Sequence, residues 1–211
     1  STEDTHGRNV AIGYAALETL NAGADAYNTA IGFNAGNAVT TGINNVLIGG
    51  MAGEALTTGN YNVAMGHAAL NAEDGHGKNV AIGHHALLVQ NAGADGNNVA
   101  VGYQAGLAVS TGIYNTLVGG AAGDALTTGG WNVVMGTHAL SSEDTGDRNI
   151  AIGKGALQSL NYDGNGYNVA VGHLAGNAMS TGTSNTLIGG LAGDALTDGN
   201  ANVAVGRGAL S

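Results

Sequence analysis

The pentapeptide NVAIG stands at residues 9–13, and close variants of it return eleven more times along the 211-residue chain. The residue that opens each copy is always Asn. Spacings between successive copies follow the order 19, 17, 17, 17, and this order then repeats. The twelve Asn residues are Asn9, Asn28, Asn45, Asn62, Asn79, Asn98, Asn115, Asn132, Asn149, Asn168, Asn185 and Asn202. A fixed period of this kind is typical of a solenoid or repeat array.

Each copy predicts one short β-strand. The Val-Ala-Ile core is rich in β-branched residues and is bounded by Asn and Gly. Because strand side chains alternate between two faces, the Val and Ile positions share one face and the Ala position lies on the other. We expect one face to form the core of the solenoid. The other face, small and smooth, then suits a neighbouring chain.

Three positions hold the same residue in all twelve copies: the Asn, the Gly four residues later, and an Ala three residues after that Gly. The Gly predicts a corner with positive φ or a close backbone approach. The Asn predicts a hydrogen-bonded ladder from copy to copy. In the three copies that are followed by a 19-residue spacing, these structural residues are Asn9, Gly13, Ala16, Asn79, Gly83, Ala86, Asn149, Gly153 and Ala156.

The sequence therefore predicts an all-β fold, a β-solenoid (β-roll or β-helix) of twelve 17–19-residue coils. Residues 1–211 form a single repeat domain with three 70-residue super-repeats, 9–78, 79–148 and a shortened 149–211. Residues 1–8 are the end of a preceding coil or a cap. The second half of each coil is either a second short strand or an irregular return. Since the chain opens without Met, we expect an excised or processed segment.

Composition excludes several classes of protein. Hydrophobic residues make up 44% and charged residues only 9%, which argues against disorder. A net charge of −10 with five scattered basic residues gives no stripe for nucleic acid. No apolar run approaches the roughly 20 residues that span a membrane. Without Cys there is no disulfide framework and no zinc site built on thiolates.

The NVAIGxxAL phrase and the stretch NTAIGFNAGNAVTTGINN (residues 28–45) resemble two related groups of repeats. One is the left-handed β-roll head of trimeric autotransporter adhesins, and the other is the repeat region of bacteriophage tail fibres. The resemblance covers nearly the whole chain. It implies a homotrimer with small residues at the interface, an extracellular position on a cell surface or virion, and adhesion without catalysis.

Eight aromatic residues recur at two fixed positions, immediately before the Asn or immediately after the Gly. Such rings could stack on sugar faces, or they could pack on one another or in a trimer seam. As candidate ligand contacts they are Tyr14, Tyr27, Phe33, Tyr61, Tyr103, Tyr114, Trp131 and Tyr167.

A Glu-Asp pair precedes a basic residue by four positions at three equivalent places. We expect a local ion pair there, with calcium bound by the carboxylates as the alternative. The metal candidates are Glu3, Asp4, Glu73, Asp74, Glu143 and Asp144, facing Arg8, Lys78 and Arg148. The seven His residues are interpreted as surface variation, because the adjacent His84 and His85 are expected to point apart. No catalytic motif or cofactor loop is present, so the sequence predicts no enzyme and no cofactor.

Three functions follow from these observations. The first is a structural and adhesive fibre segment, homotrimeric, that attaches to cell-surface glycans or polymers, with neither nucleic acid nor membrane insertion involved. The second is a carbohydrate-binding lectin in which three 70-residue repeats close into a pseudo-threefold domain. The third is an ice-binding solenoid, suggested by pairs such as Thr40-Thr41 and Thr57-Thr58.

Overall fold

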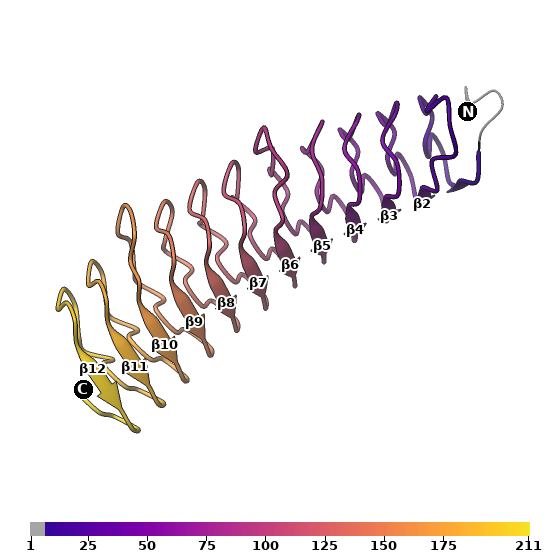
Figure 1. Ribbon diagram of the computed structural model, residues 1–211. Helices are drawn as coiled ribbons and strands as arrows, with labels where there is room; N and C mark the ends of the chain where they lie inside the picture. The colour runs from indigo at the N-terminus through magenta and orange to yellow at the C-terminus, as the bar shows by residue number, and fades with distance from the viewer. Residues whose placement is uncertain (1–6) are drawn as a thin grey trace.

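The computed structural model describes residues 7–211, and its twelve three-residue strands all lie in one parallel sheet. Each strand pairs in register with the strand before and after it in the sequence, so the order is β1 to β12 without a crossover. Figure 1 shows the strands in a row along one side of a rod, with β2 near one end and β12 at the other. The strands are β1 Val10–Ile12, β2 Thr29–Ile31, β3 Val46–Ile48, β4 Val63–Met65, β5 Val80–Ile82, β6 Val99–Val101, β7 Thr116–Val118, β8 Val133–Met135, β9 Ile150–Ile152, β10 Val169–Val171, β11 Thr186–Ile188 and β12 Val203–Val205.

The fold is thus the predicted parallel β-solenoid, and we number its coils by the strand each contains. A closed pseudo-threefold domain is wrong as a description of the fold, because the sheet runs from β1 to β12 as an open stack. The return half of each coil consists of turns, and residues 7–211 contain no second strand per coil. No helix that could cross a membrane occurs in this part of the chain.

The side of the strands that faces outward is the reverse of the expected one. In β2 to β12 the middle residue (Ala, Leu or Val) is buried, and the flanking Val, Ile, Thr and Met are partly or fully exposed. The small Ala face is therefore the core face. The reason is the narrow interior of a coil that has one strand and a tight return. This interior accommodates one side chain per strand. If the Ala faced outward, the two flanking side chains of each strand would both have to fit inside.

Two ways of filling this interior alternate along the rod. Coils 1 and 4 place Leu17 and Leu70 four residues after the corner Gly, opposite a small Ala in the strand. Coil 3 instead carries the larger Leu47 in the strand. A Cβ added at Gly36 or Gly53 would lie 2.5 Å or 2.8 Å from the methyl groups of Leu47. Leu47 thus takes up space that a side chain at those two glycines would need, and Leu117 and Leu187 do the same over Gly106, Gly123, Gly176 and Gly193.

Four backbone reversals close each coil. The corner Gly has φ between 125° and 145° in every coil, and a Cβ at Gly136 would lie 2.6 Å from the carbonyl carbon and oxygen of Gly153. Both reasons predicted for this Gly are therefore confirmed. Positive φ, between 44° and 64°, also occurs at the residue before each motif Asn and at the second and fourth residues after each corner Gly. None of these positions holds Val, Ile or Thr, for which this conformation is most costly.

The Asn ladder is also confirmed. The backbone N–H of Asn45 donates to Oδ1 of Asn28 (2.8 Å), and Nδ2 of Asn45 donates to the carbonyl of Gly59 near the end of the same coil (2.9 Å). The first bond recurs at every described step of the ladder. Where the next loop is two residues longer, the second bond changes: Nδ2 of Asn79 is buried and has no partner among residues 7–211. The ladder therefore holds every described coil to the next, with a weaker point at Asn79.

Candidate functional surfaces

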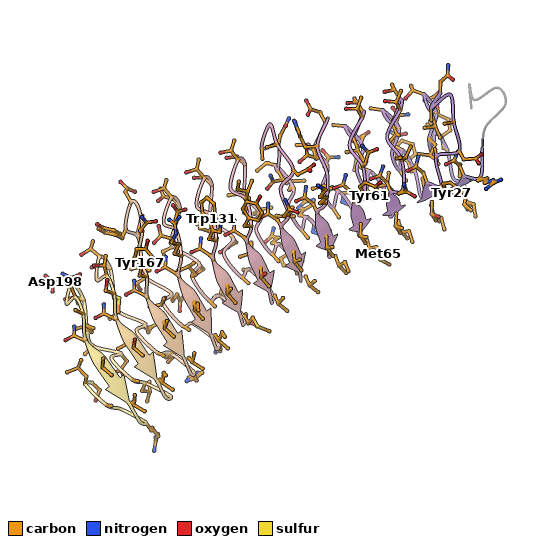
Figure 2. All side chains as sticks on the ribbon, viewed as in Figure 1. Tyr27, Tyr61, Met65, Trp131, Tyr167 and Asp198 are labelled. Atoms are coloured by element: carbon orange, nitrogen blue, oxygen red, sulfur yellow. The ribbon has the colours of Figure 1, made fainter. Side chains whose placement is uncertain are left out.

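The outward side of the sheet is an uncharged strip that runs the length of the rod. We call it the strand face: the first and third residues of all twelve strands. Of these twenty-four residues three are Thr (Thr29, Thr116 and Thr186), and all the others are Val, Ile or Met. Figure 2 shows Met65 among the side chains that project from this side. No pocket is present within residues 7–211, and the candidate surfaces all lie on the open outside of the rod.

Two columns of side chains border the strand face. One column is the residue before each motif Asn, and the other is the residue after each corner Gly. All eight predicted aromatic residues lie in these columns and are between 48% and 75% exposed. Neighbouring coils stack their rings, as Tyr14 does on Phe33 at 5.5 Å and Tyr114 on Trp131 at 5.7 Å between centroids. The rings therefore contact one another and remain accessible, which combines both interpretations of the sequence.

The longest run of such contacts is the corner patch, which we define as Tyr114, Trp131, Arg148 and Tyr167 from coils 6 to 9. The guanidinium of Arg148 lies 4.8 Å from the ring centroid of Trp131 and 5.9 Å from that of Tyr167. Each residue has positive φ, so the backbone turns at that point and presents the side chain at the corner of the coil. Trp131 and Tyr167 lie on the same side of the strand row in Figure 2.

The basic residues that precede three motif Asn residues pair with the next coil rather than with the Glu-Asp pair before them. Arg8 Nε lies 3.2 Å from Asp25 Oδ2, and Lys78 Nζ lies 2.6 Å from Asp95 Oδ2. This contact raises the pKa of Lys78 and lowers the pKa of Asp95, mainly through their hydrogen bond, since each stabilises the charged form of the other. Arg148 bonds Asn165 at the equivalent position. The ion pairs expected between Lys78 or Arg148 and the preceding Glu-Asp pair are therefore wrong. Arg148 does form a local ion pair, but with the adjacent Asp147, whose Oδ2 lies 3.7 Å from Nη1.

The reason is that Glu73 and Glu143 point into the core instead. Both are fully buried, in a column that otherwise holds Leu, Val, Met and one Gln. Oε1 of Glu143 accepts the N–H of Gly146 (2.8 Å) and Oε2 accepts that of Tyr162 (3.1 Å). Burial raises the pKa of both carboxyl groups. These bonds favour a structural role for the two Glu residues.

Calcium binding by Glu73, Asp74, Glu143 and Asp144 stays a prediction. The carbonyl groups of Asp74 and Asp144 accept the N–H groups of Thr57 and Thr127, which ties both loops to the preceding coil. The other two candidates, Glu3 and Asp4, lie outside the described residues.

The histidines hold a cluster that sequence reasoning missed. His84 and His85 do not point apart: their ring centroids are 3.8 Å from each other. His85 has φ of 58°, so the usual alternation of side chains is reversed at this residue. His67, one coil earlier and in the same column as His84, stacks on it at 5.4 Å. The signal was in the sequence, because His67 and His84 both follow a corner Gly.

The Thr pairs form an interrupted column. Thr40 and Thr57 donate their hydroxyls to carbonyl oxygens of the next coil, those of Thr57 and Asp74. Their neighbours Thr41 and Thr58 are exposed, but coils 1 and 4 lack the pair and coil 11 carries Asp198. The column therefore does not form the continuous plane of hydroxyl groups that the ice-binding hypothesis requires.

Comparison with protein-family models, curated proteins and solved structures found no match to this chain.

Proposed function

We propose that the chain is a non-enzymatic, structural and adhesive fibre segment that works outside the cell, on a cell surface or virion. In this proposal three copies assemble side by side, and the 70-residue super-repeat brings equivalent corner residues to regular intervals along the fibre. The observation that carries the proposal is the strand face, which has no charged residue in a chain of net charge −10. Large exposed apolar surfaces of this kind mark interaction sites.

The size of the strand face supports contact between copies. Twelve rungs of ~4.8 Å and a width of three residues, at ~3.3 Å per residue, give on the order of 600 Å² for each chain. An interface of standard size buries roughly 800 Å² per partner, so the strand face supplies most of that area while the bordering columns stay accessible. Assemblies of identical chains favour closed symmetry, and three strands that are each three residues wide can meet at one threefold axis. The negative charges of the three copies then lie away from the axis.

A lysine on the strand face tests this assembly. In solution we expect a molar mass near three times the 20.6 kDa of one chain by light scattering. Val118→Lys, which places a charge in the middle of the strand face, should shift the mass to that of the monomer because an unpaired charge cannot be buried at the interface. Its control is Thr128→Lys, the same added charge on the exposed return of the same coil.

The outcomes separate the alternatives. A monomeric wild-type chain, or equal effects of the two lysines, would contradict assembly through the strand face. A mass of twice that of one chain that is sensitive to Val118→Lys would keep the interface and replace the trimer by a dimer.

Adhesion is assigned to the corner patch. Exposed aromatic rings offer apolar faces to sugars, and the Trp131 indole N–H and the Arg148 guanidinium supply hydrogen-bond donors beside them. The ligand class that fits an open row of rings is a cell-surface glycan or a related polymer.

Removing the Trp131 ring should weaken glycan binding. On a glycan array the wild-type chain should bind at least one sugar class, and Trp131→Ala should lower that affinity about tenfold, which corresponds to ~1.4 kcal/mol. Tyr61→Ala is the control, because Tyr61 lies in the same column but between Asn44 and Lys78 rather than between aromatic rings. If both variants bind like the wild type, the corner patch is not the adhesive site.

A further inference from the structure

We infer that His67, His84 and His85 form a binding site for a divalent transition-metal ion such as Zn²⁺. One imidazole nitrogen from each of the three residues can be chosen so that all three lie within 4.8 Å of one another. Imidazole is a ligand that suits Zn²⁺, Cu²⁺, Ni²⁺ and Co²⁺. Three such ligands are a common protein set around zinc, with water in the fourth position.

The backbone brings the three rings together. His67 and His84 follow the corner Gly in coils 4 and 5, so their side chains repeat at the spacing of the coils. His85 is the next residue, and its positive φ returns its ring to 3.8 Å from His84 and 5.7 Å from His67. On the opposite side of His84 the ring of Tyr103 stacks at 5.4 Å, which supports the orientation of the central ligand.

The geometry needs only a small adjustment to hold a metal. Nitrogen atoms bound at 2.0–2.1 Å in a tetrahedral site lie about 3.3 Å apart. His67 and His84 are exposed, so their rings can rotate toward the ion without disturbing the core.

The chain provides two comparisons for these ligands. His173 follows the corner Gly in coil 10, as His84 does in coil 5, but its neighbours in the column are Lys154 and Gly190. His76 belongs to a second group with Glu73 and Asp74, in which Glu73 is buried and its Oε1 accepts the N–H of His76. Substitution of either residue removes one His from the chain without touching the trio.

The test is titration of the metal-free chain with ZnCl₂ by calorimetry, together with the visible absorption of bound Co²⁺. We expect one tight ion per chain, an absorption spectrum of a site with nitrogen ligands, and at least a tenfold loss of affinity in His84→Ala and His67→Ala. His173→Ala and His76→Ala should bind as the wild type does. Circular dichroism checks that the variants remain folded.

Three results would overturn the site: no saturable binding by the wild type, an unchanged affinity in His84→Ala, or an equal loss in His173→Ala. A loss confined to His76→Ala would assign the ion to the Glu73 group instead and would also overturn it. Hydrogen exchange provides a second readout, since an ion shared by coils 4 and 5 should slow exchange of the backbone amides in those two coils.

Discussion

Gly136→Ala should destabilise the rod by more than about 4 kcal/mol, the range reached by only the most disruptive single substitutions. Gly136 has φ of 134°, a conformation that costs an L-residue roughly 1–3 kcal/mol. The added Cβ would also lie 2.6 Å from the carbonyl carbon and oxygen of Gly153 in the next coil. Because that neighbour is backbone, no side-chain rotation relieves the clash, and coils 8 and 9 must separate.

The control is Gly93→Ala, which tests the conformational cost alone. Gly93 also has positive φ (69°), but an added Cβ would meet no atom within 4 Å. We expect a loss of about 1–2 kcal/mol for this variant. Chemical denaturation measures both free energies of unfolding, and hydrogen exchange localises the opening to coils 8 and 9. Equal losses would mean that contact between successive corners contributes little to stability.

Asn115→Ala should lower the free energy of unfolding by on the order of 4 kcal/mol, since each buried polar group left without a partner costs about 1–3 kcal/mol. Asn115 is fully buried and donates Nδ2–H to the carbonyl of Gly129 (2.8 Å). Its Oδ1 accepts the backbone N–H of Asn132 (3.0 Å). The substitution therefore leaves the carbonyl of Gly129 and the backbone N–H of Asn132 unsatisfied.

Asn79→Ala is the matched control within the same ladder. Asn79 is equally buried, and its Oδ1 accepts the N–H of Asn98, but its Nδ2 has no partner among the described residues. This variant should lose about half as much stability, on the order of 2 kcal/mol. If the two variants lose the same amount, the amide donor of Asn115 does not stabilise the stack.

Periodicity predicted the coil, the strand and the three invariant positions, because each depends on a short local sequence pattern that is repeated twelve times. The Asn and the Gly were assigned their roles correctly, since few residues can supply a ladder amide or tolerate the corner backbone. Which face of the strand points inward was not decided by alternation. That choice depends on the width of the interior, and the return half of the coil sets this width. For the return half the sequence pattern left two structures open, a second short strand or an irregular return.

The candidate surfaces were predicted unevenly for a related reason. The exposed aromatic columns followed from position alone, because every coil repeats the same corner. The pairing of Lys78 with Asp95 and the clustering of His67 with His84 depend on residues that lie one full coil apart in the sequence. Such contacts emerge when residues are compared with the equivalent positions of the adjacent coil rather than with their neighbours in sequence. The absence of β-branched residues at the positive-φ positions was a further signal, visible once the columns are aligned.

The alternating filling of the core also determines how the rod can change in length. Leu47 extends over Gly36 in the coil before it and Gly53 in its own coil, so coils 2 and 3 form an indivisible pair. Loss of coil 2 alone would bring Leu17 and Leu47 together, because both already border Gly36. Coil 4, at 62–78, combines Ala64 with Leu70, as coil 5 combines Ala81 with Leu87, so one of these two can be deleted or duplicated with matching neighbours. Growth of such a rod during evolution is therefore quantised, by single coils at some junctions and by pairs at others.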